Sequence, residues 1–173
     1  MADSLRRAAV LVPLQRRPTG VEVVLTRRAE GLPTHPGQIA FPGGRHEPGR
    51  DESLLATALR EAEEEIGLHP QDVDVLGALP AVATMSSGFE IHSFVALVPE
   101  GYVFTPEPGE VVEVFQMPLG ARHDPALLVA HRWSVQGRPF DVPAILFGGR
   151  LVWGATLRIL DLLLDSPLLP HAK

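Results

Sequence analysis

The sequence predicts an α/β fold in which helices flank a mixed β-sheet. Short runs rich in β-branched residues alternate with two helical patterns, and this alternation is too irregular for a doubly wound parallel sheet. Proline and glycine punctuate the whole chain, and neither a repeat nor a linker divides it. A chain of 173 residues with 45% hydrophobic content suits one substantial core. We therefore expect residues 1–173 to form a single domain.

The first part of the chain is expected to form two strands joined by a turn, since apolar runs flank residues that favour turns. A loop, a short extended piece and a bend at two glycines then lead to a polar loop. The expected segments are strands 8–14 and 21–26 with a turn at 16–20, a loop at 31–37, an extended piece at 38–41, a bend at 42–44 and a polar loop at 45–50.

A helix is expected to run from a cap at Asp51 to about Ile66. Aspartate is a preferred capping residue, and Gly67 suits the left-handed position that follows a helix end. At about 100° per residue the apolar side chains of this segment fall on one stripe, which we expect to face the core. The stripe consists of Leu54, Leu55, Ala58, Leu59, Ala62 and Ile66.

The rest of the chain is expected to supply further strands and a second helix. Strands are predicted at 73–79, 90–98, 111–117 and 144–147, and a helix with apolar residues on most faces at 155–164. The loop between the first two of these strands carries Thr84, Ser86, Ser87 and Gly88.

Composition excludes several kinds of chemistry. The chain has no cysteine, which rules out disulfides, thiol nucleophiles and zinc–thiolate sites and suits a reducing cytoplasm. Its single lysine is Lys173, so an internal phosphate-loop lysine or Schiff base is excluded. The net charge of −6 opposes binding to nucleic acid or to an anionic membrane, and no apolar run reaches the roughly 20 residues that span a bilayer. We expect a soluble, cytoplasmic protein with a small-molecule partner, and the sequence leaves monomer and homodimer open.

The expected helix carries clustered carboxylates. Glu61, Glu64 and Glu65 are three and four residues apart, so they converge at the margin of the core-facing stripe. An ordinary solvated acidic face is the alternative. However, like charges at this spacing repel, and turning Glu65 toward the apolar stripe adds a desolvation cost. A bound divalent cation compensates both, and oxygen-only ligation suits Mg²⁺ or Mn²⁺. Arg60 is placed to pair with one of the carboxylates.

At this point a resemblance becomes specific. Residues 60–68 read Arg-Glu-Ala-Glu-Glu-Glu-Ile-Gly-Leu and resemble, position by position, the terminal segment of the Nudix box. Glu52 matches the first glutamate of that box, with seven residues between it and Arg60. Gly44 is separated from Glu52 by seven residues where the box has five, a two-residue insertion in the loop.

The resemblance implies a Nudix-type α/β/α sandwich that hydrolyses a pyrophosphate bond in a nucleotide derivative. It implies that Gly43 and Gly44 let the loop approach the helix and the metal. Glu61, Glu64 and Glu65 would ligate the cation, and Arg60 would orient a glutamate. The cation would neutralise the diphosphate and lower the pKa of bound water, so that hydroxide attacks one phosphorus.

The general base is left open between two residues. One candidate is Glu64 on the helix, and the other is Glu110, which also reads as an ordinary turn carboxylate.

Segments beyond the box resemble the coenzyme A pyrophosphatase branch of this family. They are residues 25–29, residues 37–44, the loop around Thr84, residues 110–119, and residues 153–156. The branch pattern has a further arginine where this chain has Pro33. The resemblance implies hydrolysis of coenzyme A to 3′,5′-ADP and 4′-phosphopantetheine. Another nucleoside diphosphate derivative, such as ADP-ribose or a dinucleotide, and a non-catalytic nucleotide-binding module are the alternatives.

Four further side chains are candidates for substrate binding. Arg27 and Arg28 are suited to phosphates because guanidinium binds them bidentately, or they are solubilising residues at a strand end. Phe41 and Phe89 are candidates for the border of an adenine or pantetheine pocket, against ordinary packing. Trp153 is expected to be a core residue beside the last helix.

Overall fold

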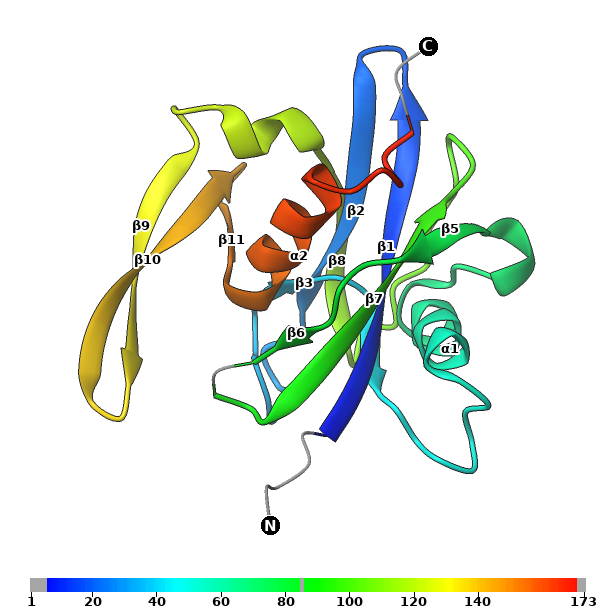
Figure 1. Cartoon of the computed structure of the whole chain (residues 1–173), viewed down its shortest axis with the longest axis horizontal. Helices are drawn as coiled ribbons and strands as arrows, with labels where there is room; N and C mark the ends of the chain where they lie inside the picture. The colour runs from blue at the N-terminus through cyan, green and yellow to red at the C-terminus, as the bar shows by residue number, and fades with distance from the viewer. Residues whose placement is uncertain (1–5, 85, 171–173) are drawn as a thin grey trace.

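The computed structural model describes residues 6–84 and 86–170, so residues 1–5 and Lys173 lie outside the described residues. The elements appear in Figure 1. In chain order they are β1 (Arg6–Arg17), β2 (Gly20–Arg28), β3 (Ile39–Ala40), β4 (Gly43–Arg45), α1 (Leu54–Ile66), η1 (Pro70–Asp72), β5 (Asp74–Ala78), β6 (Val82–Ala83), β7 (Phe89–Leu97), β8 (Val111–Pro118), η2 (Leu119–His123), β9 (Leu128–Val135), β10 (Arg138–Phe147), β11 (Arg150–Trp153) and α2 (Gly154–Leu164).

A large mixed sheet forms the centre of the fold. Its main path runs β3-β2-β1-β7-β5, with β4 on β1, β6 on β7 and β8 on β2. The β1–β7 pair is parallel, whereas the other pairs in this sheet are antiparallel. The predicted mixed sheet is therefore confirmed, and the first two strands extend beyond their expected ends at 8–14 and 21–26.

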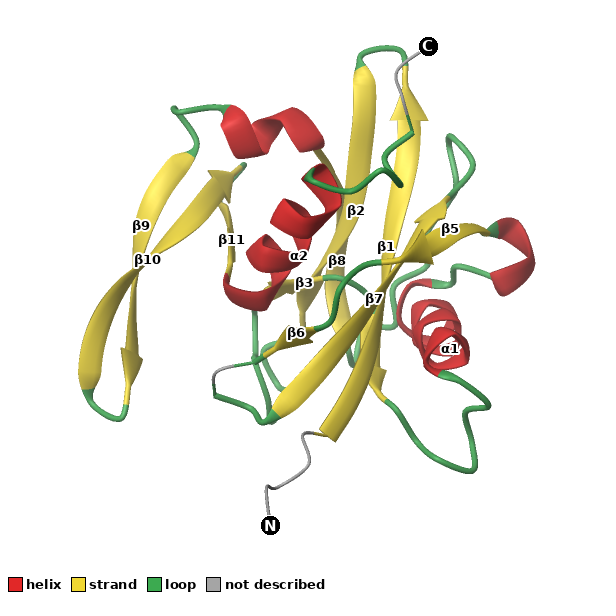
Figure 2. Cartoon of the chain, in the orientation of Figure 1, coloured by secondary structure: helices red, strands yellow, loops and turns green. Residues whose placement is uncertain are grey.

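The helices α1 and α2 cover opposite faces of this sheet, as Figures 1 and 2 show. The alternation of β1 determines which side chains meet which helix. Ala9 and Leu11 pack with Ala58, Ala62 and Ile66 of α1, because odd-numbered residues of β1 face that helix. Val10, Val12 and Leu14 of β1 belong to the larger core, which also contains the buried apolar side chains of α2. This arrangement confirms the α/β/α sandwich.

A second, three-stranded sheet has the order β11-β10-β9. Ile145 and Val152 from this sheet are fully buried in the larger core beside α2, while most of β9 lies exposed on the extended hairpin seen in Figure 2. Only residues 144–147 of this sheet were expected as strand. The rest of β10 was not expected because Pro139 and Pro143 stand within it, and proline argues against a strand interior. β9 and β11, which contain no proline, were not expected either.

Helix α1 begins differently from the expectation. Its cap is Ser53, whose hydroxyl accepts a hydrogen bond from the Ala56 N–H at 3.0 Å, so the prediction that Asp51 caps the helix is wrong. The expected end is confirmed, because Gly67 adopts the left-handed conformation at φ 65°. The expected bend at 42–44 is also wrong in part, since Gly43 and Gly44 belong to β4 and pair with β1.

In the described part of the chain, neither helix combines the length and the apolar character needed to cross a membrane.

Candidate metal centre and adjoining pocket

Three carboxylates converge between α1 and the start of β8. Glu61 and Glu65 come from α1 and Glu110 from the turn before β8, and each offers an oxygen within 4.8 Å of the others. The turn is held in place by the helix end, because the Glu107 N–H donates to the Glu65 carbonyl at 2.9 Å and the Thr105 N–H to the Ile66 carbonyl at 2.8 Å. Backbone bonds to the last turn of α1 therefore bring Glu110 to the helical glutamates.

Burial makes this cluster electrostatically costly. Glu65 is only 6% exposed, and burial, together with the nearby Glu61 and Glu110, raises its pKa to about 8. The Gly43 N–H, which donates to Glu65 Oε2 at 3.3 Å, and the charge of Arg28 oppose that rise. Burial also raises the pKa of Glu61 against the pull of Arg60. The cluster has more negative charge than its neighbours compensate.

The two glycines of β4 allow this close packing. A side-chain carbon at Gly44 would lie 2.5 Å from Cδ of Glu61, and one at Gly43 would lie 2.4 Å from the carbonyl oxygen of Ala9. Any larger residue at Gly44 must displace the Glu61 carboxylate.

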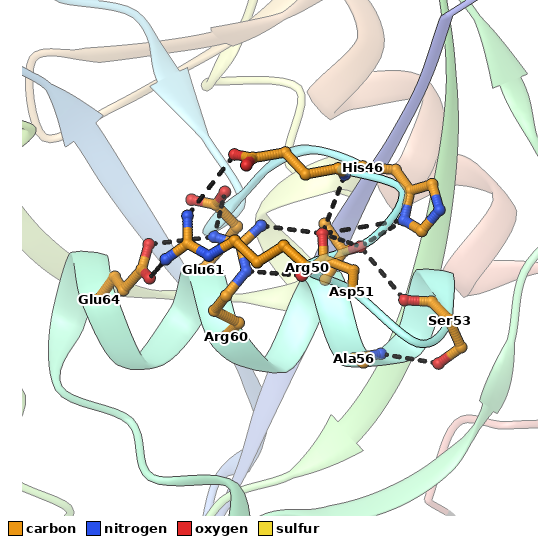
Figure 3. Close-up of polar contacts among 10 residues, drawn as sticks. His46, Arg50, Asp51, Ser53, Ala56, Arg60, Glu61 and Glu64 are labelled. Atoms are coloured by element: carbon orange, nitrogen blue, oxygen red, sulfur yellow. Dashed lines mark hydrogen bonds and ion pairs between the residues drawn. The ribbon is translucent and has the colours of Figure 1, made fainter.

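Arg60 joins the cluster to a buried anchor, as Figure 3 shows. Its guanidinium donates to both oxygens of Asp51, at 2.7 and 3.0 Å, and also to Glu61 at 2.9 Å and Glu64 at 3.1 Å. Asp51 is 8% exposed and further accepts from Thr57 Oγ1 and from the Glu47 N–H. The hydrogen bond from Arg60 is the main reason why the pKa of Asp51 lies well below its usual range.

Glu64 lies outside the group formed by Glu61, Glu65 and Glu110. Its side chain is 40% exposed and pairs with Arg60 and Arg50. Helical spacing alone placed Glu64 with the other two glutamates, but in the structure its carboxylate pairs with Arg50 and Arg60 instead.

The neighbouring Arg27 and Arg28 have different partners. The positive charge of Arg28 opposes the rise in the pKa of Glu65, and Arg28 Nη2 donates to the Thr34 carbonyl. Arg27 forms an ion pair with Glu113 at 3.3 Å, and Glu113 is also held by Arg150. Arg28 therefore lies toward the carboxylate cluster, and Arg27 toward a second group of charges.

An open pocket of about 260 Å³ lies beside Arg27. Its walls come from residues 27–39 and from β11 with the turn before it. Trp153, expected in the core, is half-buried and lines this pocket. Phe41 lies in the larger core at 4% exposure, and Phe89 lies under the Arg6 guanidinium at 4.2 Å. Neither phenylalanine is among the residues that line the pocket.

Sequence reasoning missed Asp51, Arg50, Glu113 and Arg150 as parts of these charge networks. Asp51 precedes Arg60 by nine positions, which is no helical spacing, so only the conformation of the loop brings the two together. Glu52, the residue that matches the first glutamate of the Nudix box, is exposed.

The carboxylate cluster fits a hard divalent cation. Its donors are oxygens only, as Mg²⁺ and Mn²⁺ prefer, and its excess negative charge is of the kind that such a cation relieves. Gly44 keeps the space beside Glu61 free of a side chain.

Comparison with known proteins points to one family. A model of the NUDIX domain matches residues 5–136. The chain is 38% identical over 163 residues to a protein of Photorhabdus laumondii described as an uncharacterised Nudix hydrolase NudL, covering 92% of this chain and 84% of the relative. A relative of the same description from Cronobacter sakazakii is 41% identical over 160 residues, covering 90% and 79%.

Solved structures share the fold at low identity. A Nudix hydrolase from M. smegmatis, RenU, matches with a TM-score of 0.64 at 19% identity, covering 96% of this chain and 90% of that chain. The NUDIX domain of Shewanella oneidensis NrtR, solved in complex with ADP ribose, matches with a TM-score of 0.51 at 20% identity, covering 68% and 75%.

Proposed function

The chain belongs to the Nudix hydrolase family, which hydrolyses pyrophosphate bonds of nucleotide derivatives, and we propose that its own substrate is coenzyme A. The products would be 3′,5′-ADP and 4′-phosphopantetheine. The observation that carries this choice is the 260 Å³ pocket, because Arg27, Gly37 and Trp153 on its walls belong to three separate segments that resemble the coenzyme A pyrophosphatase branch.

Nudix hydrolases generally use divalent metals, and we propose Mg²⁺ or Mn²⁺ for this chain. Glu61 and Glu65 would hold the cation, with Glu110 or Glu64 as a further ligand. When bound, the cation supplies charge neutralisation of the diphosphate and activation of water. The convergence of Glu110 with the two helical glutamates supports its place in the site, and the ion pairs of Glu64 argue that its carboxylate must turn to reach a cation.

The residues around the metal site orient its ligands and bind the substrate. Arg60 orients Glu61 through its 2.9 Å hydrogen bond. Arg28, which faces Glu65, is suited to a substrate phosphate, because arginine binds phosphate bidentately. Gly43 and Gly44 have no side chains, so β4 can pack closely against Glu61 and against the backbone of β1. The general base is Glu64 or Glu110, and Glu110 has the position closer to the other carboxylates.

Two other functions are alternatives to the hydrolysis of coenzyme A. Hydrolysis of ADP-ribose or a dinucleotide uses the same chemistry with a different nucleotide. A nucleotide-binding module without catalysis is disfavoured, because a binding surface for an anion has no use for three clustered carboxylates.

The whole chain is proposed to work as one domain, since buried residues of both sheets and of α2 share one core. The lack of cysteine supports a reducing cytoplasm as its compartment.

A substrate panel tests the proposal. Purified protein is incubated with coenzyme A, dephospho-coenzyme A, ADP-ribose and a dinucleotide, with Mg²⁺ or Mn²⁺ and with a chelator, and products are identified by mass spectrometry. We expect metal-dependent cleavage, with the highest kcat/KM for coenzyme A. Dephospho-coenzyme A should be poorer because an arginine loses its phosphate partner. A clear preference for ADP-ribose would overturn the substrate, and no cleavage of any compound would favour the binding module.

A further inference from the structure

The pocket beside Arg27 has one aromatic wall that is fixed by its neighbours. The indole of Trp153 lies 4.5 Å from the His131 ring and 5.4 Å from the Trp133 ring, measured between centroids. Ile39 and Leu151 add apolar surface beside it. A rigid aromatic side chain next to apolar residues is the kind of surface on which a planar heteroaromatic ring stacks.

The lining of the pocket also includes a hydrogen-bond acceptor that is free within the described residues. Glu30 lines the pocket, and within residues 6–84 and 86–170 no hydrogen bond or ion pair engages its carboxylate. Its position depends on Gly37, because a side-chain carbon there would lie 2.4 Å from Glu30 Oε1. An ionised carboxylate only accepts hydrogen bonds, whereas the amide of Gln38 both donates and accepts. This pair suits a ring that carries an amino group beside a ring nitrogen.

The pocket is connected to the carboxylate cluster through consecutive residues. Arg27 lines the pocket, and the charge of the next residue, Arg28, attracts the Glu65 carboxylate of the cluster. The Ala29 N–H donates to the Glu110 carbonyl at 2.9 Å, directly before Glu30. At about 260 Å³ the pocket lies below the roughly 300–1,000 Å³ of sites that enclose a whole ligand, so it suits one end of a longer molecule.

We propose that this pocket binds the purine base of the substrate, stacked on Trp153, with the exocyclic amine of the base donating to Glu30. The inference rests on the proposed function only in taking the substrate to contain adenine. With position 6 of the ring facing Glu30, the pocket would select a 6-aminopurine over a 6-oxopurine, because a 6-carbonyl facing the Glu30 carboxylate leaves two acceptors opposed.

Equilibrium binding of ADP and IDP tests the proposal, since these nucleotides differ in the exocyclic group of the base. The chain has two tryptophans, and W133F keeps an aromatic ring at the position that contacts Trp153 while leaving Trp153 as the reporter of stacking. We expect ADP to quench its fluorescence in the presence of Mg²⁺, with IDP binding roughly tenfold more weakly, the factor that one hydrogen bond provides. Equal affinities for ADP and IDP, or no quenching by ADP, would overturn the proposal.

A variant of the acceptor provides the second measurement. In E30Q the amide can donate to a ring carbonyl, so the preference for ADP over IDP should shrink toward equality. E100Q removes an exposed carboxylate that does not line the pocket and should keep the wild-type preference. An unchanged preference in folded E30Q contradicts the base contact. Binding is measured apart from hydrolysis, so the two proposals can fail separately. A protein that prefers ADP over IDP but cleaves no substrate would contradict the proposed function alone. A protein that cleaves its substrate without preferring ADP over IDP would contradict this inference alone.

Discussion

Asp51 and Arg60 form a bidentate ion pair at the base of the carboxylate cluster, with Nε to Oδ1 at 2.7 Å and Nη2 to Oδ2 at 3.0 Å. The third guanidinium nitrogen of Arg60 reaches Glu61 and Glu64. Since the Asp51 side chain is almost fully buried, it fixes the rotamer of Arg60, and Arg60 in turn fixes Glu61. The loop before α1 thus controls a candidate ligand on α1.

The first prediction follows from this pair. D51N removes the charge that holds Arg60, and breaking a buried pair in this way typically costs about 3–5 kcal/mol of unfolding free energy. We expect a loss near the lower end, because Arg60 keeps Glu61 and Glu64 as partners. Chemical denaturation measures the stability, and kcat with KM measures the misplacement of Glu61 as a fall mainly in kcat.

The adjacent E52Q is the matched control for D51N. Glu52 is exposed, so its replacement should change stability by no more than about 0.5 kcal/mol. If E52Q is the more damaging of the two, the exposed glutamate holds the site and the Asp51 anchor is unimportant.

The second prediction separates the glutamates of α1. Because Glu61 and Glu65 converge with Glu110 while Glu64 pairs with arginines, E61Q and E65Q should weaken binding of Mg²⁺ or Mn²⁺ more than E64Q does. Titration calorimetry of the metal gives the affinities directly. We expect a loss of at least tenfold for E65Q, equal to about 1.4 kcal/mol. A larger loss of affinity in E64Q than in E61Q and E65Q would place Glu64 in the metal site and contradict this prediction.

Local patterns predicted some parts of the molecule and missed others for physical reasons. The mixed sheet, the end of α1 at Gly67 and the convergence of Glu61 with Glu65 follow from periodicity and helix geometry. The role of Asp51 could not be predicted, because a loop with an insertion determines which acidic residue meets Arg60. The separate surroundings of Arg27 and Arg28 depend on β8 and β11, which are distant in the sequence.

The third prediction concerns the space at Gly44. G44A places a carbon 2.5 Å from Cδ of Glu61, so this carboxylate must move while the backbone, which has no positive φ there, remains unstrained. We expect metal affinity and kcat to fall by about tenfold or more, with thermal stability changed much less. G120A has open space around its new carbon and should match the wild type in both assays. Full activity in G44A would show that the position of Glu61 is unimportant.

The last prediction is a pH dependence that originates at Glu65. Its ordinary pKa of 4.5 is raised to about 8 in the folded protein, chiefly by burial and then by Glu61. Between these values the folded chain holds a proton that the unfolded chain has released. Without metal, stability should therefore fall as pH rises from about 4.5 to about 8, by at most roughly 1.4 kcal/mol per pH unit. Binding of Mg²⁺ requires the ionised carboxylate, so it should release a proton and strengthen with rising pH over the same window.

Urea unfolding in chelator from pH 5 to pH 9 measures the slope of stability against pH. E65Q should be flatter than the wild type, and E52Q, at an exposed position, should retain the wild-type slope. Parallel slopes for E65Q and the wild type would show that Glu65 is already ionised at low pH, and the expected proton release on metal binding would then be absent as well.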